Sequence, residues 1–175
     1  MKIFIRKGKP GDGKAIAASL KECCNGECKD CFNRYLCNEK SFTEKNISRI
    51  DKRLSLKDER YCVLVAIDKD NDKIAGFCSF IGNRLERTEH RAECGWFVNI
   101  NYARKGIATK LLTKLLIEAR KSGLRKLEAE VAVDNLASVK LAEKLGFVRE
   151  GLKKDSIKLS EKRFIDSFLY GKVLS

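Results

Sequence analysis

The spacing of apolar residues alternates between helical and extended periods through the second half of the chain. From residue 107 to residue 119 the apolar positions recur every three or four residues, which predicts an amphipathic helix that ends at Gly123. Residues 127–133 then alternate apolar and polar, as a strand does, and residues 136–145 return to the helical period. Two more strands are expected over 147–152 and 164–173. This β-α-β-α-β order restricts the chain to an α/β fold.

The first half of the chain predicts the rest of a central sheet. A continuous β-prone apolar run over 61–67 is typical of a strand that is buried on both faces. Residues 68–72 are turn formers, so we interpret 74–81 as the returning strand of a hairpin. Further strands are expected over 2–6 and 91–98, and a helix over 15–20. Ser41 and Glu44 form a capping-box pattern, which predicts a polar helix that runs to about residue 56. The 175 residues fit one domain, 1–175, in which only a Cys-rich insertion at about 22–40 breaks the composition.

The charge balance favours an anionic partner. Lys and Arg number 37 against 24 Asp and Glu, and the formal net charge is +13. Such a field suits nucleic acid, an acidic membrane surface or a polyphosphate ligand, and it equally suits a surface that is only solvated. No apolar stretch approaches the roughly 18 residues of a membrane span. The apolar start over 3–5 is too short for the core of a signal peptide, so we expect a cytoplasmic protein without a membrane partner.

Five of the eight cysteines fall within the Cys-rich insertion. Closely spaced thiolates can bind one metal ion, because little loop entropy is lost on closure, and four of them suit Zn²⁺ or an iron–sulfur cluster. The predicted ligands are Cys24, Cys28, Cys31 and Cys37, with Cys23 as an alternative to Cys24. The other interpretation is a loop of reduced or pairwise oxidised thiols without metal. Cys62, Cys78 and Cys94 lie inside apolar runs, where free cysteines commonly act as small buried hydrophobes.

The chemistry is expected where the strand over 91–98 ends and the helix at 107 begins. Gly106-Ile107-Ala108 places small residues at a helix start, where free N–H groups and the helix dipole form an anion site. Arg104 and Lys105 add positive charge at the same place, so the segment suits a pyrophosphate. The other interpretation is an ordinary tight turn with two solvated cations.

A second segment begins with Asn135, directly after the next strand. Asn135 either caps the following helix or offers its amide to a ligand that lies across the sheet. The two segments together resemble the GNAT superfamily of acetyl-CoA-dependent N-acetyltransferases. Its pyrophosphate motif, Gln/Arg-x-x-Gly-x-Gly/Ala, is matched by residues 103–108. Its later Asn-x-x-Ala/Ser … Gly-Phe motif is matched by Asn135, Ser138, Gly146 and Phe147.

The resemblance covers nearly the whole chain outside about 22–40 and implies a single GNAT-like domain with a mixed, mostly antiparallel sheet flanked by helices. It implies acetyl transfer from acetyl-CoA to a primary amine by direct attack in a ternary complex. The end of the chain is similar to the branch that acetylates ribosomal-protein N-termini, amino acids and diamines. The implied cofactor contacts are Phe97, Val98, Arg104, Lys105, Gly106, Ile107, Ala108, Thr109, Asn135 and Ser138.

The resemblance also implies catalytic roles. A general base is useful because the amine arrives protonated, and the strand before the phosphate loop offers Glu93. In an apolar strand its pKa would be raised; the alternative is a solvent-facing Glu paired with a cation. The Val98 N–H would stabilise the oxyanion. Two positions depart from the family pattern: Ala103 replaces Gln or Arg, and Ala142 replaces a Tyr acid, which leaves Tyr170 and Tyr102 as candidate acids.

Two classes of function lead at this point, and two further interpretations stay open, namely a non-acetyl acyl-CoA transferase and a metal-sensing regulator built on the Cys-rich insertion. The first is the N-acetyltransferase. The second is a basic nucleic-acid- or ribosome-associated binding module that keeps the fold without catalysis, and the two alanines, Ala103 and Ala142, favour it. The charge of +13 exceeds what one cofactor requires. An acceptor on a ribosome would use that excess, but plain solvation explains it more simply. The acceptor amine and the oligomeric state are not predicted.

Overall fold

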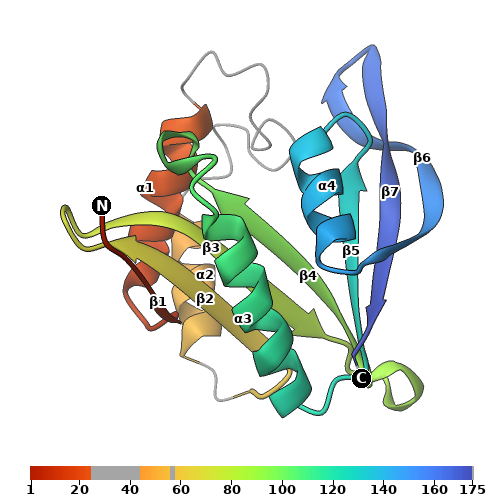
Figure 1. Cartoon of the computed structure of the whole chain (residues 1–175), viewed down its shortest axis with the longest axis horizontal. Coiled ribbons are helices and arrows are strands. Elements are labelled where there is room, and N and C mark those ends of the chain that lie inside the picture. The colour runs from red at the N-terminus through yellow and green to blue at the C-terminus, as the bar shows by residue number, and fades with distance from the viewer. Residues whose placement is uncertain (25–43, 56–57, 175) are drawn as a thin grey trace.

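The computed structural model describes residues 1–24, 44–55 and 58–174, which form a seven-stranded sheet with helices on both faces (Figure 1). The strands are β1 (Ile3–Lys7), β2 (Tyr61–Asp68), β3 (Lys73–Gly82), β4 (Arg91–Val98), β5 (Lys126–Ala132), β6 (Val148–Ser160) and β7 (Arg163–Val173). The helices are α1 (Asp12–Cys24), α2 (Glu44–Leu54), α3 (Ile107–Lys121) and α4 (Leu136–Lys144), with short 3-10 turns η3 (Glu86–Thr88) and η4 (Ile100–Tyr102).

The strand order is β1-β2-β3-β4-β5-β7-β6, and β4–β5 is the one parallel pair that the described residues contain. The other neighbours pair antiparallel. The α/β class and the mixed, mostly antiparallel sheet predicted from the sequence are therefore confirmed. The parallel pair holds over only three residue pairs, of which Glu93 with Glu128 is the last. Beyond that point β4 and β5 separate toward the top of the sheet (Figure 1).

Each face of the sheet has its own apolar layer. The predicted stripe of α3 is buried against one face, with Leu111, Leu112 and Leu115 fully enclosed. The opposite face carries alternate residues of β2, such as Val63 and Val65, under α1 and α2. β2 is thus buried on both faces, as its continuous apolar run predicts. Gly123 follows α3 with φ of 75°, the left-handed conformation expected of a helix-ending glycine.

Two elements are much longer than predicted. β6 was expected over 147–152 but runs from Val148 to Ser160. Its added residues lie largely exposed on the edge of the sheet, so they lack the apolar alternation that marks a half-buried strand. α1 was expected over 15–20 but spans Asp12–Cys24. Its last turn carries the buried Cys23, which packs as an apolar residue against Phe97.

An ion pair at the start of α1 provides a test of the fold. Both carboxylate oxygens of Asp12 accept hydrogen bonds from the Arg6 guanidinium, at 2.6 and 2.8 Å, and one also accepts from the Lys9 N–H. Burial alone would raise the pKa of Asp12, but these hydrogen bonds outweigh it and the pKa is lowered.

We expect Asp12→Asn to lower the free energy of unfolding by about 2 kcal/mol at pH 7, the scale of hydrogen bonds to a buried charge. Because the pKa of Asp12 is lowered on folding, its contribution is present above the ordinary Asp value of about 4 and is lost as the pH falls below it. Urea denaturation at pH 7 and at about pH 3 measures both effects. Glu161→Gln, which breaks an exposed pair with Lys158, is the control and should cost under about 0.5 kcal/mol. Equal losses from both substitutions would contradict this role for Asp12.

Candidate active site

The loop after β4 enters α3 through a glycine that has open space around it. Gly106 has φ of 72°, and a Cβ added to it would meet no heavy atom within 4 Å. Side chains rarely adopt this conformation, which explains a glycine here. Gly106 also offers no side-chain acceptor to the first turn of α3. The N–H groups of that turn, at Ile107, Ala108 and Thr109, are therefore available to an anionic ligand.

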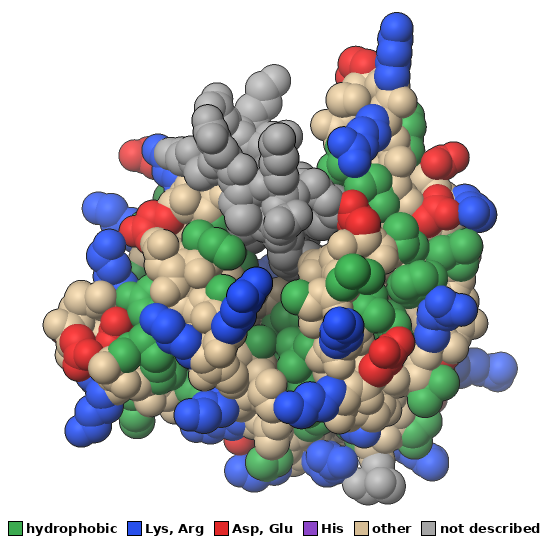
Figure 2. Space-filling view, turned by 45° about the horizontal axis from the view of Figure 1, so that its top comes forward, with side chains coloured by type: hydrophobic (Ala, Val, Ile, Leu, Met, Phe, Trp, Pro, Cys, Tyr) green, Lys and Arg blue, Asp and Glu red, His purple; other side chains and the backbone are tan. Residues whose placement is uncertain are grey.

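A cavity of about 310 Å³ lies between this helix start, the end of β4 and the start of α4. Figure 2 shows this face with a central hollow, hydrophobic side chains at its base and Lys and Arg around it. The predicted contacts that line the cavity are Phe97, Val98, Arg104, Gly106, Ile107, Ala108, Thr109, Asn135 and Ser138. Lys105 does not line it, because its ammonium turns back to the Asn101 carbonyl at 3.3 Å and over the Tyr102 ring. Among the described residues, Arg104 is thus the one cation that lines the cavity.

Asn135 fills the first of its two predicted roles, the helix cap. Its side-chain oxygen accepts from the Ser138 N–H at 3.1 Å and so caps α4. This contact fixes the amide orientation, since only the oxygen can accept. The Nδ2 atom on the other side is buried and has no hydrogen-bond partner among the described residues. A buried donor without a partner costs about 1–3 kcal/mol, and a carbonyl of a bound ligand would remove that cost.

The divergence of β4 from β5 exposes backbone donors of β4. The Asn99 N–H bonds to the Ala75 carbonyl on β3 at 2.9 Å. Successive residues of a paired strand direct their N–H groups to opposite sides, so the Val98 N–H is directed toward β5. Pairing with β5 has already ended at Glu93. The Val98 N–H therefore faces the opening, where the oxyanion donor was predicted.

Glu93 lies where the opening between β4 and β5 begins. It shares a sheet face with Glu128 and Glu130 of β5, because side chains alternate along a strand. Glu128 is held by Arg91 and Lys126, and Glu130 by Lys153 and Ser167. Burial would raise the pKa values of Glu128 and Glu130, yet these partners lower both. Glu93 makes no hydrogen bond or ion pair within 1–24, 44–55 and 58–174, and its side chain is exposed. Glu93 is thus solvent-facing, as the alternative predicted, but among the described residues it lacks the cation partner that the alternative also expected.

The comparisons with known proteins agree on one family. The family model described as "Acetyltransferase (GNAT) family" matches residues 21–147. The chain belongs to the GNAT acetyltransferase family. An uncharacterized N-acetyltransferase of Bacillus licheniformis is 33% identical over 112 residues, covering 63% of this chain and 60% of the relative. A ribosomal-protein-serine acetyltransferase of Escherichia coli is 30% identical over 115 residues, covering 65% and 62%.

Two solved acetyltransferase structures superimpose over nearly the full length of the chain. The crystal structure of a GNAT-family acetyltransferase from Streptococcus pneumoniae superimposes with a TM-score of 0.80 at 25% identity, covering 98% of this chain and 99% of that one. A Salmonella typhimurium acetyltransferase solved with acetyl-CoA gives a TM-score of 0.77 at 22% identity, covering 99% and 94%. In sequence, the aligned part spans about half to three fifths of the curated relatives.

Neither candidate acid of this GNAT protein is placed to donate a proton into the cavity. Tyr170 is 1% exposed and does not line the cavity; its hydroxyl donates to Glu143 on α4 at 3.1 Å. Burial and that hydrogen bond raise its pKa. Tyr102 lines the cavity, but its hydroxyl donates to Asp68 at 3.1 Å. This geometry does not support the predicted role of Tyr170. The sequence could not show this, because it does not reveal how far a side chain on β7 reaches.

The described cysteines near the sheet are unsuited to covalent catalysis. Burial raises the pKa of Cys62 to about 11 and that of Cys94 to about 12, so both remain thiols at neutral pH. The predicted metal ligands Cys28, Cys31 and Cys37 lie outside the described residues, and Cys24 ends α1. Within the described ranges, no three His, Cys, Asp or Glu side chains gather to hold a metal ion. The metal site in the Cys-rich insertion stays a prediction.

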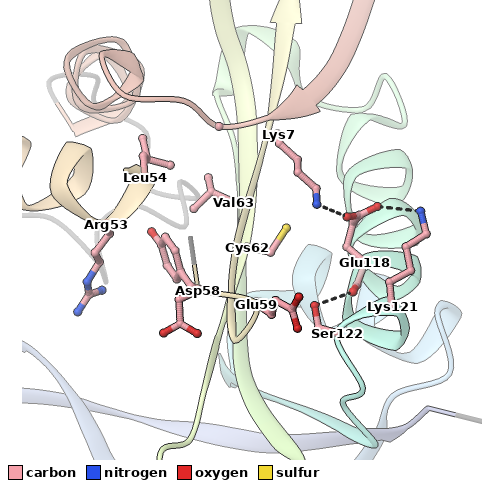
Figure 3. Close-up of a pocket in the computed structure, with 12 residues that line it drawn as sticks. Lys7, Arg53, Leu54, Asp58, Glu59, Cys62, Val63, Glu118, Lys121 and Ser122 are labelled. Atoms are coloured by element: carbon pink, nitrogen blue, oxygen red, sulfur yellow. Dashed lines mark hydrogen bonds and ion pairs between the residues drawn. The ribbon is translucent and has the colours of Figure 1, made fainter. Parts of the chain in front are cut away.

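A larger cavity, of about 810 Å³, lies at the opposite end of α3 and does not suit a phosphate (Figure 3). The C-terminal end of a helix is its negative end. The ammonium groups of Lys7 and Lys121 both bind Glu118, at 2.6 and 3.3 Å. The described lining also contains Arg53, Asp58 and Glu59, so its three cations are matched by three carboxylates. The two ends of α3 therefore differ in sign, and only the end at Gly106 favours a pyrophosphate.

Six lining residues of the Gly106 cavity were not predicted as cofactor contacts, namely Trp96, Ile100, Tyr102, Ala103, Ala137 and Leu141. As a binding contact, none of these carries a sequence signal, since each fits equally well into a core. Trp96 alone was conspicuous, as the one Trp of the chain.

No helix of the described residues has the length and apolar character that crossing a membrane requires.

Proposed function

We propose that this protein transfers an acetyl group from acetyl-CoA to a primary amine within a ternary complex. The observation that carries the proposal is one cavity that combines the open helix start at Gly106 with the unpartnered amide of Asn135. The first suits a pyrophosphate. The second suits an amide carbonyl, which coenzyme A carries between its pyrophosphate and its thiol.

The residues of the opening suit the two demands of the reaction. When bound, acetyl-CoA supplies a thioester carbonyl that an uncharged amine can attack. Glu93, where the opening begins, is the proposed acceptor of the amine proton, because Glu128 and Glu130 are occupied by cations that make them weaker bases. The Val98 N–H is the proposed donor to the carbonyl oxygen as negative charge develops there. Direct attack is supported because no cysteine of the described residues lines the cavity.

Asn135→Asp separates the two roles of Asn135. Asp caps helices as well as Asn does, so the melting temperature should stay close to wild type. The carboxylate has no N–H to donate, so we expect acetyl-CoA affinity to fall about tenfold or more. Calorimetric titration and thermal melting measure the two effects, with Asn135→Ala, which removes both groups, as the comparison. An unchanged affinity in a folded Asn135→Asp protein would show that Nδ2 contacts no cofactor atom.

Thiol release from acetyl-CoA in the presence of an amine panel tests the function itself. The panel contains free amino acids, polyamines and peptide N-termini, because relatives are named for an L-amino acid and for a ribosomal protein. We expect amine-dependent release with at least one of these classes. Acetyl-CoA binding without release for every class would favour the binding module instead. A failure to bind acetyl-CoA would refute the proposal altogether.

A further inference from the structure

Trp96 lies in the opening where β4 and β5 separate. It lies on β4 beyond the last residue paired with β5. Its side chain is 8% exposed, and its indole N–H donates to the Ser138 hydroxyl on α4 at 3.2 Å. Its ring also packs at 6.4 Å from the Phe147 ring. The indole is therefore held from two sides, and it lines the Gly106 cavity.

The cavity has two chemically different ends. Gly106 and the first turn of α3 form one end, and Trp96, two residues before Val98 on β4, lies toward the other. Acetyl-CoA carries its pyrophosphate and its thioester at opposite ends of the pantetheine arm. With the pyrophosphate at Gly106 and the arm passing Asn135, the acyl group points toward Trp96.

We propose that Trp96, locked by Ser138, closes the acyl end of the cavity and limits the transferred group to the size of acetyl. This inference rests on the proposed function, since it requires acyl-CoA in this cavity. A buried, hydrogen-bonded indole is costly to displace, because forcing extra methylenes against packed side chains strains them. Each methylene that does not fit typically changes binding about 10-fold or more.

Calorimetric titration of acetyl-CoA and butyryl-CoA into wild type and Trp96→Leu tests the limit. We expect wild type to bind butyryl-CoA at least about tenfold more weakly than acetyl-CoA. Trp96→Leu opens the closed end, so the two dissociation constants should come within about twofold of each other. A wild-type protein that binds both equally, or a Trp96→Leu protein that keeps the wild-type ratio, would overturn the proposal.

Two further variants separate the acyl limit from a loss of stability. Phe80→Leu removes a ring that is 0% exposed on β3 and does not line this cavity, so it should lower the melting temperature and leave the affinity ratio unchanged. Ser138→Ala removes the hydrogen bond of the indole but keeps the indole. It should therefore lower the ratio of the butyryl-CoA to the acetyl-CoA dissociation constant, even if Trp96→Leu fails to fold. The proposed role of the hydrogen bond between Trp96 and Ser138 would be contradicted by either of two results. One is a smaller ratio of the butyryl-CoA to the acetyl-CoA dissociation constant in Phe80→Leu, and the other is the wild-type ratio in Ser138→Ala.

Intrinsic fluorescence provides a readout that does not depend on turnover. Trp96 is the one Trp of the 175 residues, so its emission reports this position alone. We expect acetyl-CoA to change the emission of Trp96 more than free coenzyme A does, because only the former brings an acyl group to the indole. Equal changes at calorimetrically verified saturation would place the acyl group elsewhere and leave the proposed function intact. Absence of any calorimetric binding would instead refute the proposed function.

Discussion

Gly106→Glu should abolish measurable acetyl-CoA binding while the protein remains folded. The new carboxylate would lie where the first turn of α3 meets the pyrophosphate. Two like charges at about 4 Å repel by about 4 kcal/mol at an effective dielectric constant of 20, which corresponds to about a thousandfold in affinity. The substitution meets no protein atom within 4 Å of the added Cβ, so its direct effect on packing is small. Calorimetry measures the loss.

Gly123→Glu is the matched control for this substitution. Gly123 also has a left-handed φ, 75° against 72° at Gly106, and also has no heavy atom within 4 Å of an added Cβ. Both variants therefore carry a similar backbone strain and the same added charge, but at opposite ends of α3. Gly123→Glu should bind acetyl-CoA like wild type. Equal losses in both variants would assign the effect to strain, and retained affinity in Gly106→Glu would place the pyrophosphate elsewhere.

Glu93→Gln should lower turnover by roughly a hundredfold or more, the scale of a general base. Acetyl-CoA affinity should stay near wild type, since Glu93 does not line the cofactor cavity. The variant keeps the shape of the side chain and removes its ability to accept a proton. Initial rates with saturating acceptor, together with calorimetry, measure the two quantities.

Glu128→Gln is the control for the charge of this sheet face. Glu128 pairs directly with Glu93 across the strands, so the substitution removes the same charge from the same face. Because Glu128 is held by Arg91 and Lys126, it should not serve as the base, and turnover should change by less than about threefold. A large loss of turnover in Glu128→Gln, together with full turnover in Glu93→Gln, would make Glu128 the general base instead of Glu93.

The sequence predicts the parts of the site that rest on local geometry. Gly106 and Asn135 stand out because a left-handed helix start and a helix cap are set by neighbouring residues. Trp96 could not be assigned, since its role follows from the divergence of β4 and β5 and from a contact with Ser138 on another element. The prediction that Glu93 is buried was wrong, because the sequence of a single strand does not reveal which of its faces is covered. The hydroxyl contact of Tyr170 likewise depends on where α4 lies.

Direct transfer from one ligand to the other is tested by following the acetyl group itself. The protein is mixed with acetyl-CoA labelled with carbon-13 in the acetyl group and with an amine from the panel. Mass spectrometry then follows both the amine and the protein. We predict labelled amine in an amount equal to the thiol released, with no label on the protein at any time. Label that appears on the protein before it reaches the amine, or thiol release without labelled amine, would contradict direct transfer.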